Sequence, residues 1–143
     1  MDSLPEVLKG LLFDVLKHAI FAEQSVGVLP AVKAFENFSG QEAVTLGIRQ
    51  LVGMCLSFDR IKCTTDPGWD FLTDEGYERS LGYLMAVEEG GLHFAAPSCE
   101  PWVWVARYGT ARTKANPAGD QSVQRVKDAN EVARQQANKF MFA

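Results

Sequence analysis

The sequence lacks the cysteine spacing of a metal site or of a disulfide framework. Its three cysteines, Cys55, Cys63 and Cys99, form an odd set without a Cys-x-x-Cys pair. Structural zinc sites and disulfide-stapled domains use closely spaced or even-numbered cysteines, so neither class of protein is indicated. We therefore expect reduced thiols, no metal site and an intracellular protein, nuclear or cytoplasmic.

Strong charge and long apolar runs are also missing. The 143 residues carry 14 Lys and Arg against 18 Asp and Glu, a net charge of −4, which favours neither nucleic acid nor an anionic membrane surface. The apolar N-terminal stretch is interrupted by Lys9, Asp14 and Lys17 and has no basic leader. This pattern predicts neither a signal peptide nor a membrane span.

The basic residues are nevertheless concentrated towards the C-terminus. Residues 107–139 carry seven basic side chains against three acidic ones, whereas the remainder carries seven against fifteen. Two interpretations remain open: an ordinary solvated helix face, or a segment from Arg107 to Lys139 that contacts DNA phosphates.

Glycine is scarce where a dinucleotide-binding turn would need it. The stretch ENFSGQEAVTLGIRQ, residues 36–50, runs from an apolar segment through a short turn into an amphipathic helical pattern. A nicotinamide or flavin fingerprint needs Gly-x-Gly-x-x-Gly, but this stretch has only Gly40 and Gly47. A dehydrogenase is therefore not indicated, although the strand–turn–helix pattern is typical of a ligand-binding turn.

Hydrophobic periodicity predicts alternating helices and strands. With 47% hydrophobic residues, the chain has enough apolar material for one core. An amphipathic helix is expected in residues 3–24 with Ser3 as its cap, and Ala43, Leu46 and Leu51 mark the sheet-facing side of a helix that begins near Gln41. Strands are expected at 31–35, at 54–59 and, buried on both faces, at 92–97.

The second half of the chain continues the same alternation. Thr73 or Asp74 is expected to cap a helix that runs to Val87 and is closed by EEGG. A loop at 106–120 then leads to a helix at 121–139. The pattern predicts an α/β fold with a mostly parallel sheet, an N-terminal helical segment at 1–30 and a single domain at 31–143.

Four short motifs follow one another along this pattern. They are Phe38-Ser39-Gly40 with a Leu-Gly-Ile-Arg stretch on the next helix, Asp59 at the end of a strand, Asp70-Phe71, and Pro97-Ser98-Cys99-Glu100. In this order and spacing they resemble the motifs of the cytosine 5-methyltransferases, over roughly residues 32–120. The stretch RTKANPAG also resembles the loop that closes over a flipped base in that family.

The resemblance implies an incomplete Rossmann-like methyltransferase sheet with helices on both faces and S-adenosylmethionine as cofactor. It places Phe38, Ser39, Gly40 and Pro97 in the cofactor pocket, Asp59 on the ribose hydroxyls and Asp70 beside the adenine. It also makes Cys99 the nucleophile.

Elementary chemistry supports some of these roles and leaves alternatives open. Methylation of carbon 5 of cytosine needs a thiolate that attacks carbon 6, and a cysteine between a strand and a helix N-terminus can supply one. Cys99 can equally be a small buried hydrophobe, while Asp59 and Asp70 can be turn or capping residues. Trp102 and Trp104 are read as packing residues, with base stacking as the alternative, and His93 as structural.

The sequence also departs from the family pattern. Glu42 and Ala43 stand where the family has two glycines, and Ser98 replaces a proline. The Glu-Asn-Val strand, the Gln-x-Arg-x-Arg strand and the target-recognition domain are not found. Two hypotheses follow: a cofactor-binding protein that methylates DNA through Cys99, or a non-catalytic truncated module that binds a ligand or partner. A second chain that completes the sheet would reconcile them.

Overall fold

The computed structural model describes residues 29–62, 64–98, 102 and 107–140, together with five positions nearer the N-terminus, namely Gly10, Phe13, Leu16, Lys17 and Gly27. Cys63, Cys99 and Trp104 lie outside the described residues. So do Glu100 and most of the helix predicted for residues 3–24.

Among the described residues, a sheet of three parallel strands organises the fold. The strands are β1 (Val32–Asn37), β2 (Cys55–Phe58) and β3 (Val87–Ala95), in the order β2-β1-β3. Asn37, the last residue of β1, is level with Phe58 on one side and with Ala95 on the other. The carboxyl ends of all three strands therefore meet at one edge of the sheet, and the predicted α/β class with a parallel sheet is confirmed.

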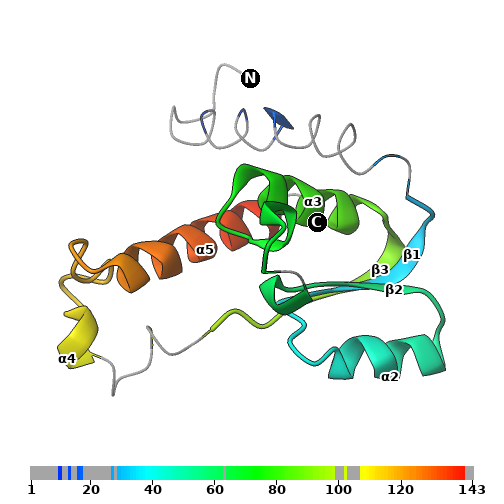
Figure 1. Cartoon of the computed structure of the whole chain (residues 1–143), viewed down its shortest axis with the longest axis horizontal. Helices are drawn as coiled ribbons and strands as arrows, with labels where there is room; N and C mark the ends of the chain where they lie inside the picture. The colour runs from blue at the N-terminus through cyan, green and yellow to red at the C-terminus, as the bar shows by residue number, and fades with distance from the viewer. Residues whose placement is uncertain are drawn as a thin grey trace.

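Helices cover both faces of this sheet. Helix α2 (Ala43–Leu51) lies on one face, and α3 (Asp74–Met85) and α5 (Gln124–Phe140) lie on the other (Figure 1). Parallel strands need such crossovers, because a tight turn cannot return the chain to the same end of the sheet. Within the described part of the chain, none of the helices is apolar over a length that would cross a bilayer.

Helix α3 begins where the sequence predicted but ends earlier. The Thr73 hydroxyl oxygen accepts the N–H of Gly76 at 3.0 Å, which confirms Thr73 as the cap. EEGG does not close the helix, so that prediction was wrong. These residues belong to β3, where Gly90 has a φ of 77° and the register with β1 shifts. The glycines form a bulge in a strand rather than a helix stop.

Strand β3 is less buried than expected. It lies at the edge of the sheet, and the side chains of Leu92 and Phe94 are 51% and 38% exposed. The prediction of a strand buried on both faces was wrong because α2 packs over β1 and β2, and leaves this face of β3 open to solvent.

The buried side of α2 also differs from the prediction. Leu46 and Leu51 are 51% and 85% exposed, whereas Thr45 is fully buried. The carboxylate of Glu36 on β1 accepts hydrogen bonds from the backbone N–H and the hydroxyl of Thr45. This buried polar contact, rather than the apolar periodicity, sets which side of α2 faces the sheet.

The aromatic core under α3 and α5 includes a lysine. Its buried members are Phe35, Phe58, Phe71, Tyr77, Leu81 and Leu84. Lys139 of α5 is 0% exposed, donates to the Ser80 hydroxyl, and has its ammonium 4.3 Å from the centroid of the Phe71 ring. Burial holds the pKa of Lys139 well below its usual value. Both interpretations of the basic segment placed Lys139 at the surface, and for this residue both were wrong.

Arg112 makes several contacts in the described part of the segment between β3 and α5. Arg112 donates to the carbonyl of Pro117 at 2.6 Å and to the side-chain oxygen of Asn130 at 2.8 Å. Its guanidinium lies 3.6 Å from the centroid of the Trp102 ring. The predicted loop contains the short helix α4 (Arg107–Thr110), and α5 begins at Gln124 rather than at residue 121. Two 3-10 turns, Arg60–Lys62 and Pro67–Trp69, complete the described elements.

Candidate functional site

The turn after β1 is tied to the end of β2. Phe38 and Gly40 both adopt positive φ angles, 63° and 50°. The N–H of Ser39 donates to the carbonyl of Phe58 at 3.1 Å, which extends the pairing of the two strands by one residue. The turn is thereby held at the carboxyl edge of the sheet.

Asp59 secures the same turn from the neighbouring strand. One carboxylate oxygen accepts the N–H of Gly40 at 2.8 Å, and the other accepts the N–H of Ile61 at 2.9 Å. The structure thus brings together two residues that the sequence singled out, Gly40 and Asp59. Each carboxylate oxygen has a second lone pair, so Asp59 can still accept a hydrogen bond from a ligand hydroxyl.

Sequence reasoning missed Glu36, which occupies the N-terminal end of α2. Its side chain is 7% exposed, and one carboxylate oxygen accepts the N–H of Thr45 at 2.7 Å. The free N–H groups and the dipole of a helix N-terminus favour anions such as phosphate. Here the carboxylate of the chain itself fills that position. The only signal in the sequence was an acid that directly follows the apolar pair Ala34-Phe35.

Glu42 stands in a conformation that suits glycine. Its φ is 59°, and its carboxylate accepts the Ser57 hydroxyl at 2.6 Å and pairs with Lys62. The Lys62 ammonium, followed by the Ser57 hydroxyl, holds the pKa of the Glu42 carboxyl below its usual value. Side-chain contacts therefore offset a strained backbone at this position.

We expect Glu42→Gly to be more stable than Glu42→Ala by about 1 kcal/mol, because both variants lose the side-chain contacts but only glycine adopts this φ without strain. Urea unfolding of the two variants measures the difference. Equal stabilities would show that the turn relaxes to a negative φ once the glutamate is removed.

Asp70 has a structural role in its own turn. One carboxylate oxygen accepts the N–H of Leu72 at 3.0 Å, and the other lies 3.5 Å from the guanidinium of Arg60. These contacts hold the turn that leads into α3. Asp70, like Ser39, Gly40 and Asp59, is not among the residues that line the pocket described next.

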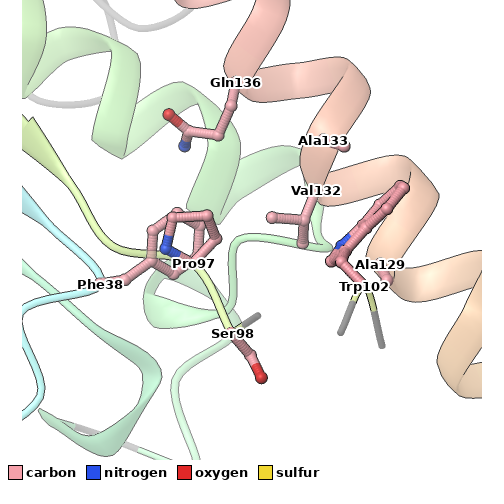
Figure 2. Close-up of a pocket in the computed structure, with 8 residues that line it drawn as sticks. All are labelled: Phe38, Pro97, Ser98, Trp102, Ala129, Val132, Ala133 and Gln136. Atoms are coloured by element: carbon pink, nitrogen blue, oxygen red, sulfur yellow. The ribbon is translucent and has the colours of Figure 1, made fainter. Parts of the chain in front are cut away.

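A pocket of about 120 Å³ opens at the carboxyl edge of the sheet, between the ends of β1 and β3 (Figure 2). Phe38 and Pro97, both predicted as cofactor contacts, lie on one side of it, and α5 closes the other. The lining residues are Phe38, Pro97, Ser98, Trp102, Ala129, Val132, Ala133 and Gln136. Cys99, two residues beyond Pro97, is outside the described residues.

Buried polar groups without partners gather around this edge. Asn37 is 0% exposed, Ser39 6% and Gln136 6%. Their side-chain polar atoms have no hydrogen-bond partner among the described residues. Leaving such groups unpaired costs folding free energy, so their presence at one edge of the sheet favours a ligand-binding role there.

The position of the pocket agrees with how open α/β sheets bind ligands. The chain leaves β1 to form β2 on one side and returns to form β3 on the other. Ligands bind outside the carboxyl ends of the strands, where the strand order reverses in this way. Across the described ranges, no group of three or more His, Cys, Asp or Glu side chains is arranged to hold a metal ion.

Comparison with known proteins does not assign the chain to a family: no family model, curated protein or solved structure matches it.

Proposed function

We propose that this protein binds S-adenosylmethionine in an incomplete Rossmann-like domain of the cytosine 5-methyltransferase type. Three features support the proposal. The strand order places β1 centrally, the pocket lies where that order reverses, and Asp59 projects from the end of β2 beside the Gly40 turn. In this arrangement Asp59 accepts from the ribose hydroxyls, and Phe38 and Pro97 pack against the cofactor.

The observation that carries the proposal is the buried carboxylate of Glu36 at the N-terminus of α2. Dinucleotide cofactors place a pyrophosphate at this helix end, and a carboxylate 2.7 Å from the Thr45 nitrogen repels it. S-adenosylmethionine carries no phosphate, and its ammonium and sulfonium charges outweigh its single carboxylate, so it meets less repulsion there. The site therefore favours a nucleoside-type cofactor over NAD or FAD.

The methyl-transfer step assigned to Cys99 follows from cytosine chemistry. Cys99 would add as a thiolate to carbon 6 and make carbon 5 nucleophilic, and a bound S-adenosylmethionine would supply the methyl group and depart as S-adenosylhomocysteine. Loss of the carbon 5 proton and of the thiolate then restores the ring. DNA as the methyl acceptor would contact the exposed Lys114 and Lys127, because Arg112 and Arg134 are engaged in contacts within the chain.

A second candidate, a non-catalytic module, is favoured by two observations. The pocket of about 120 Å³ is smaller than the roughly 300–1,000 Å³ of most small-molecule sites. The edge strand β3 also exposes Leu92 and Phe94. A second chain that covers this face and extends the sheet would enlarge the crevice and complete the domain.

Titration calorimetry with S-adenosylhomocysteine tests the first proposal. We expect Asp59→Asn to weaken binding about tenfold, because one charge-assisted hydrogen bond contributes roughly 1.5 kcal/mol. Asp66→Asn is the matched control, since Asp66 also accepts a backbone N–H, from Gly68, but pairs with Arg79 of α3 instead of the Gly40 turn. An unchanged affinity in Asp59→Asn would remove Asp59 from the site, and no binding by the unmodified chain would favour the non-catalytic module.

A further inference from the structure

One face of α5 closes the pocket. Ala129, Val132, Ala133 and Gln136 recur at the spacing that puts residues on the same side of a helix. Three of them are small or apolar: Ala129 is buried, Val132 is half-buried and Ala133 is exposed. The fourth is an amide, and Figure 2 shows it directed towards Phe38 and Pro97.

The Gln136 amide is buried without a partner. The residue is 6% exposed, and neither Oε1 nor Nε2 has a hydrogen-bond partner among the described residues. Gln135, its neighbour on α5, is buried to a similar extent and its Oε1 also lacks a partner among the described residues, but its Nε2 donates to Glu131 at 2.9 Å, so of the two only Gln136 has neither amide atom paired. A leucine at position 136 would fill the same space without the cost of desolvating an amide. The polar atoms of Gln136 therefore serve something other than packing.

The size and the walls of the pocket define the group that fits. Its volume of about 120 Å³ is on the scale of an engineered cavity of roughly 150 Å³ that holds a single benzene ring. The rings of Phe38 and Pro97 form one side, and Val132 faces them from α5 (Figure 2). Trp102 at the margin is 46% exposed. One planar six-membered ring can enter from solvent and lie between these apolar walls.

A side-chain amide presents a hydrogen-bond donor beside an acceptor. It pairs with a ring edge that presents an acceptor opposite this donor and a donor opposite this acceptor. We propose that the pocket binds an aminopyrimidine ring, with Gln136 Oε1 accepting from the amino group and Nε2 donating to the adjacent ring nitrogen. Cytosine and the six-membered ring of adenine both carry this edge. The site would thus recognise a base by its hydrogen-bonding edge, through a helix residue that lies outside every motif of the family resemblance.

This inference goes beyond the proposed function, because it depends on Gln136 and the pocket and needs neither Asp59 nor methyl transfer. Two sources can supply the ring: a cytosine base, or the adenine of a cofactor. Cytidine and adenosine distinguish them. An amide can rotate by 180° and pair with uracil as well, so the informative comparison is with analogues that lack only the amino group.

The test is an NMR titration of the full chain with four nucleosides: cytidine, adenosine and the analogue of each without its amino group. We expect the unmodified chain to bind cytidine or adenosine about tenfold more tightly than the matching analogue, because the analogue leaves a buried acceptor unpaired. In Gln136→Leu, the affinity for the nucleoside and the affinity for its analogue without the amino group are expected to lie within about twofold of each other. A preference in the cytidine pair identifies a base as the source, and one in the adenosine pair identifies the cofactor.

Two controls separate recognition from folding. Gln136→Leu is expected to melt at a higher temperature than the unmodified chain, since it removes an unpaired buried amide. Gln135→Leu, one residue away and outside the pocket lining, is expected to keep the amino-group preference. The proposal is overturned if the unmodified chain binds neither nucleoside, if it binds them no better than their analogues, or if the preference survives Gln136→Leu.

Discussion

Replacing Lys139 with methionine is expected to raise the free energy of unfolding at pH 7 by about 2 kcal/mol, because a buried amino group, which must either lack a counter-charge or give up its proton, is replaced by an apolar chain of similar shape. Among the described residues, the ammonium contacts the Ser80 hydroxyl and the rings of Phe35, Phe71 and Tyr77, and it has no carboxylate partner. These contacts offset only part of the cost of removing the charge from water.

The pH dependence provides a second measurement of the same effect. The folded state lowers the pKa of Lys139, so the unfolded chain binds more protons at every pH between the folded value and about 10.4. Stability should therefore rise as the pH increases from 7 to 9, and Lys139→Met should lack this rise. Guanidinium unfolding at several pH values, carried out on the unmodified chain and on Lys139→Met, measures the rise and its absence.

The neighbouring titratable groups are Tyr77 of α3 and His93 of β3. Burial, followed by the charge of Lys139, lowers the pKa of His93 to about 4, so His93 affects stability only as the pH falls below about 6.5. It does not contribute to the interval from pH 7 to 9. A rise between pH 7 and 9 that persists in Lys139→Met would show that another group causes it.

The second large effect is expected at Gly76 in the first turn of α3. A Cβ at this position would lie 1.9 Å from the backbone oxygen of Asp70. That oxygen also accepts the N–H of Thr73 at 3.0 Å and its hydroxyl at 2.8 Å, so it cannot move without breaking the cap of the helix. Gly76→Ala is expected to cost about 3 kcal/mol.

Gly47 in α2 is the matched control. Apart from its chain neighbours and the backbone of its own helix, no described heavy atom lies within 4 Å of a Cβ built there, and its φ is not positive. Gly47→Ala should therefore raise the free energy of unfolding by roughly 0.5–1 kcal/mol, as alanine does in a helix. Chemical denaturation of both variants tests the pair. If Gly76→Ala lowers the free energy of unfolding by no more than about 1 kcal/mol, the turn at Asp70 adjusts to the added methyl group.

Signals that act over a few residues were readable in the sequence. Thr73 caps α3 because its hydroxyl reaches an N–H three residues away, and that requires no distant partner. The strand–turn–helix around Gly40 was predicted for the same reason. The EEGG stretch led to a wrong prediction of a helix end, because glycine pairs occur both at helix ends and at strand bulges. Pairing with β1 makes these residues part of a strand.

The candidate site was predictable only in part. The parallel strands bring Gly40 beside Asp59, and Phe38 and Pro97 to one pocket, because carboxyl ends of parallel strands meet at one edge. For Asp70 the sequence left open a place beside the adenine and a role in a turn, and the structure shows the turn contacts. Glu36 and Gln136 were missed, since a buried acid or amide has the same letter in the sequence as an exposed one.

The sequence by itself determined the α/β class and the turn that follows β1, because periodicity, capping and turn preference act within a few residues. Only the tertiary structure decided which surfaces are covered. The helical pattern of residues 124–140 defines a face, but the docking of that face places Lys139 in the aromatic core and Gln136 in the pocket. Burial is a property of the distant residues that pack against a side chain, and no local pattern encodes them.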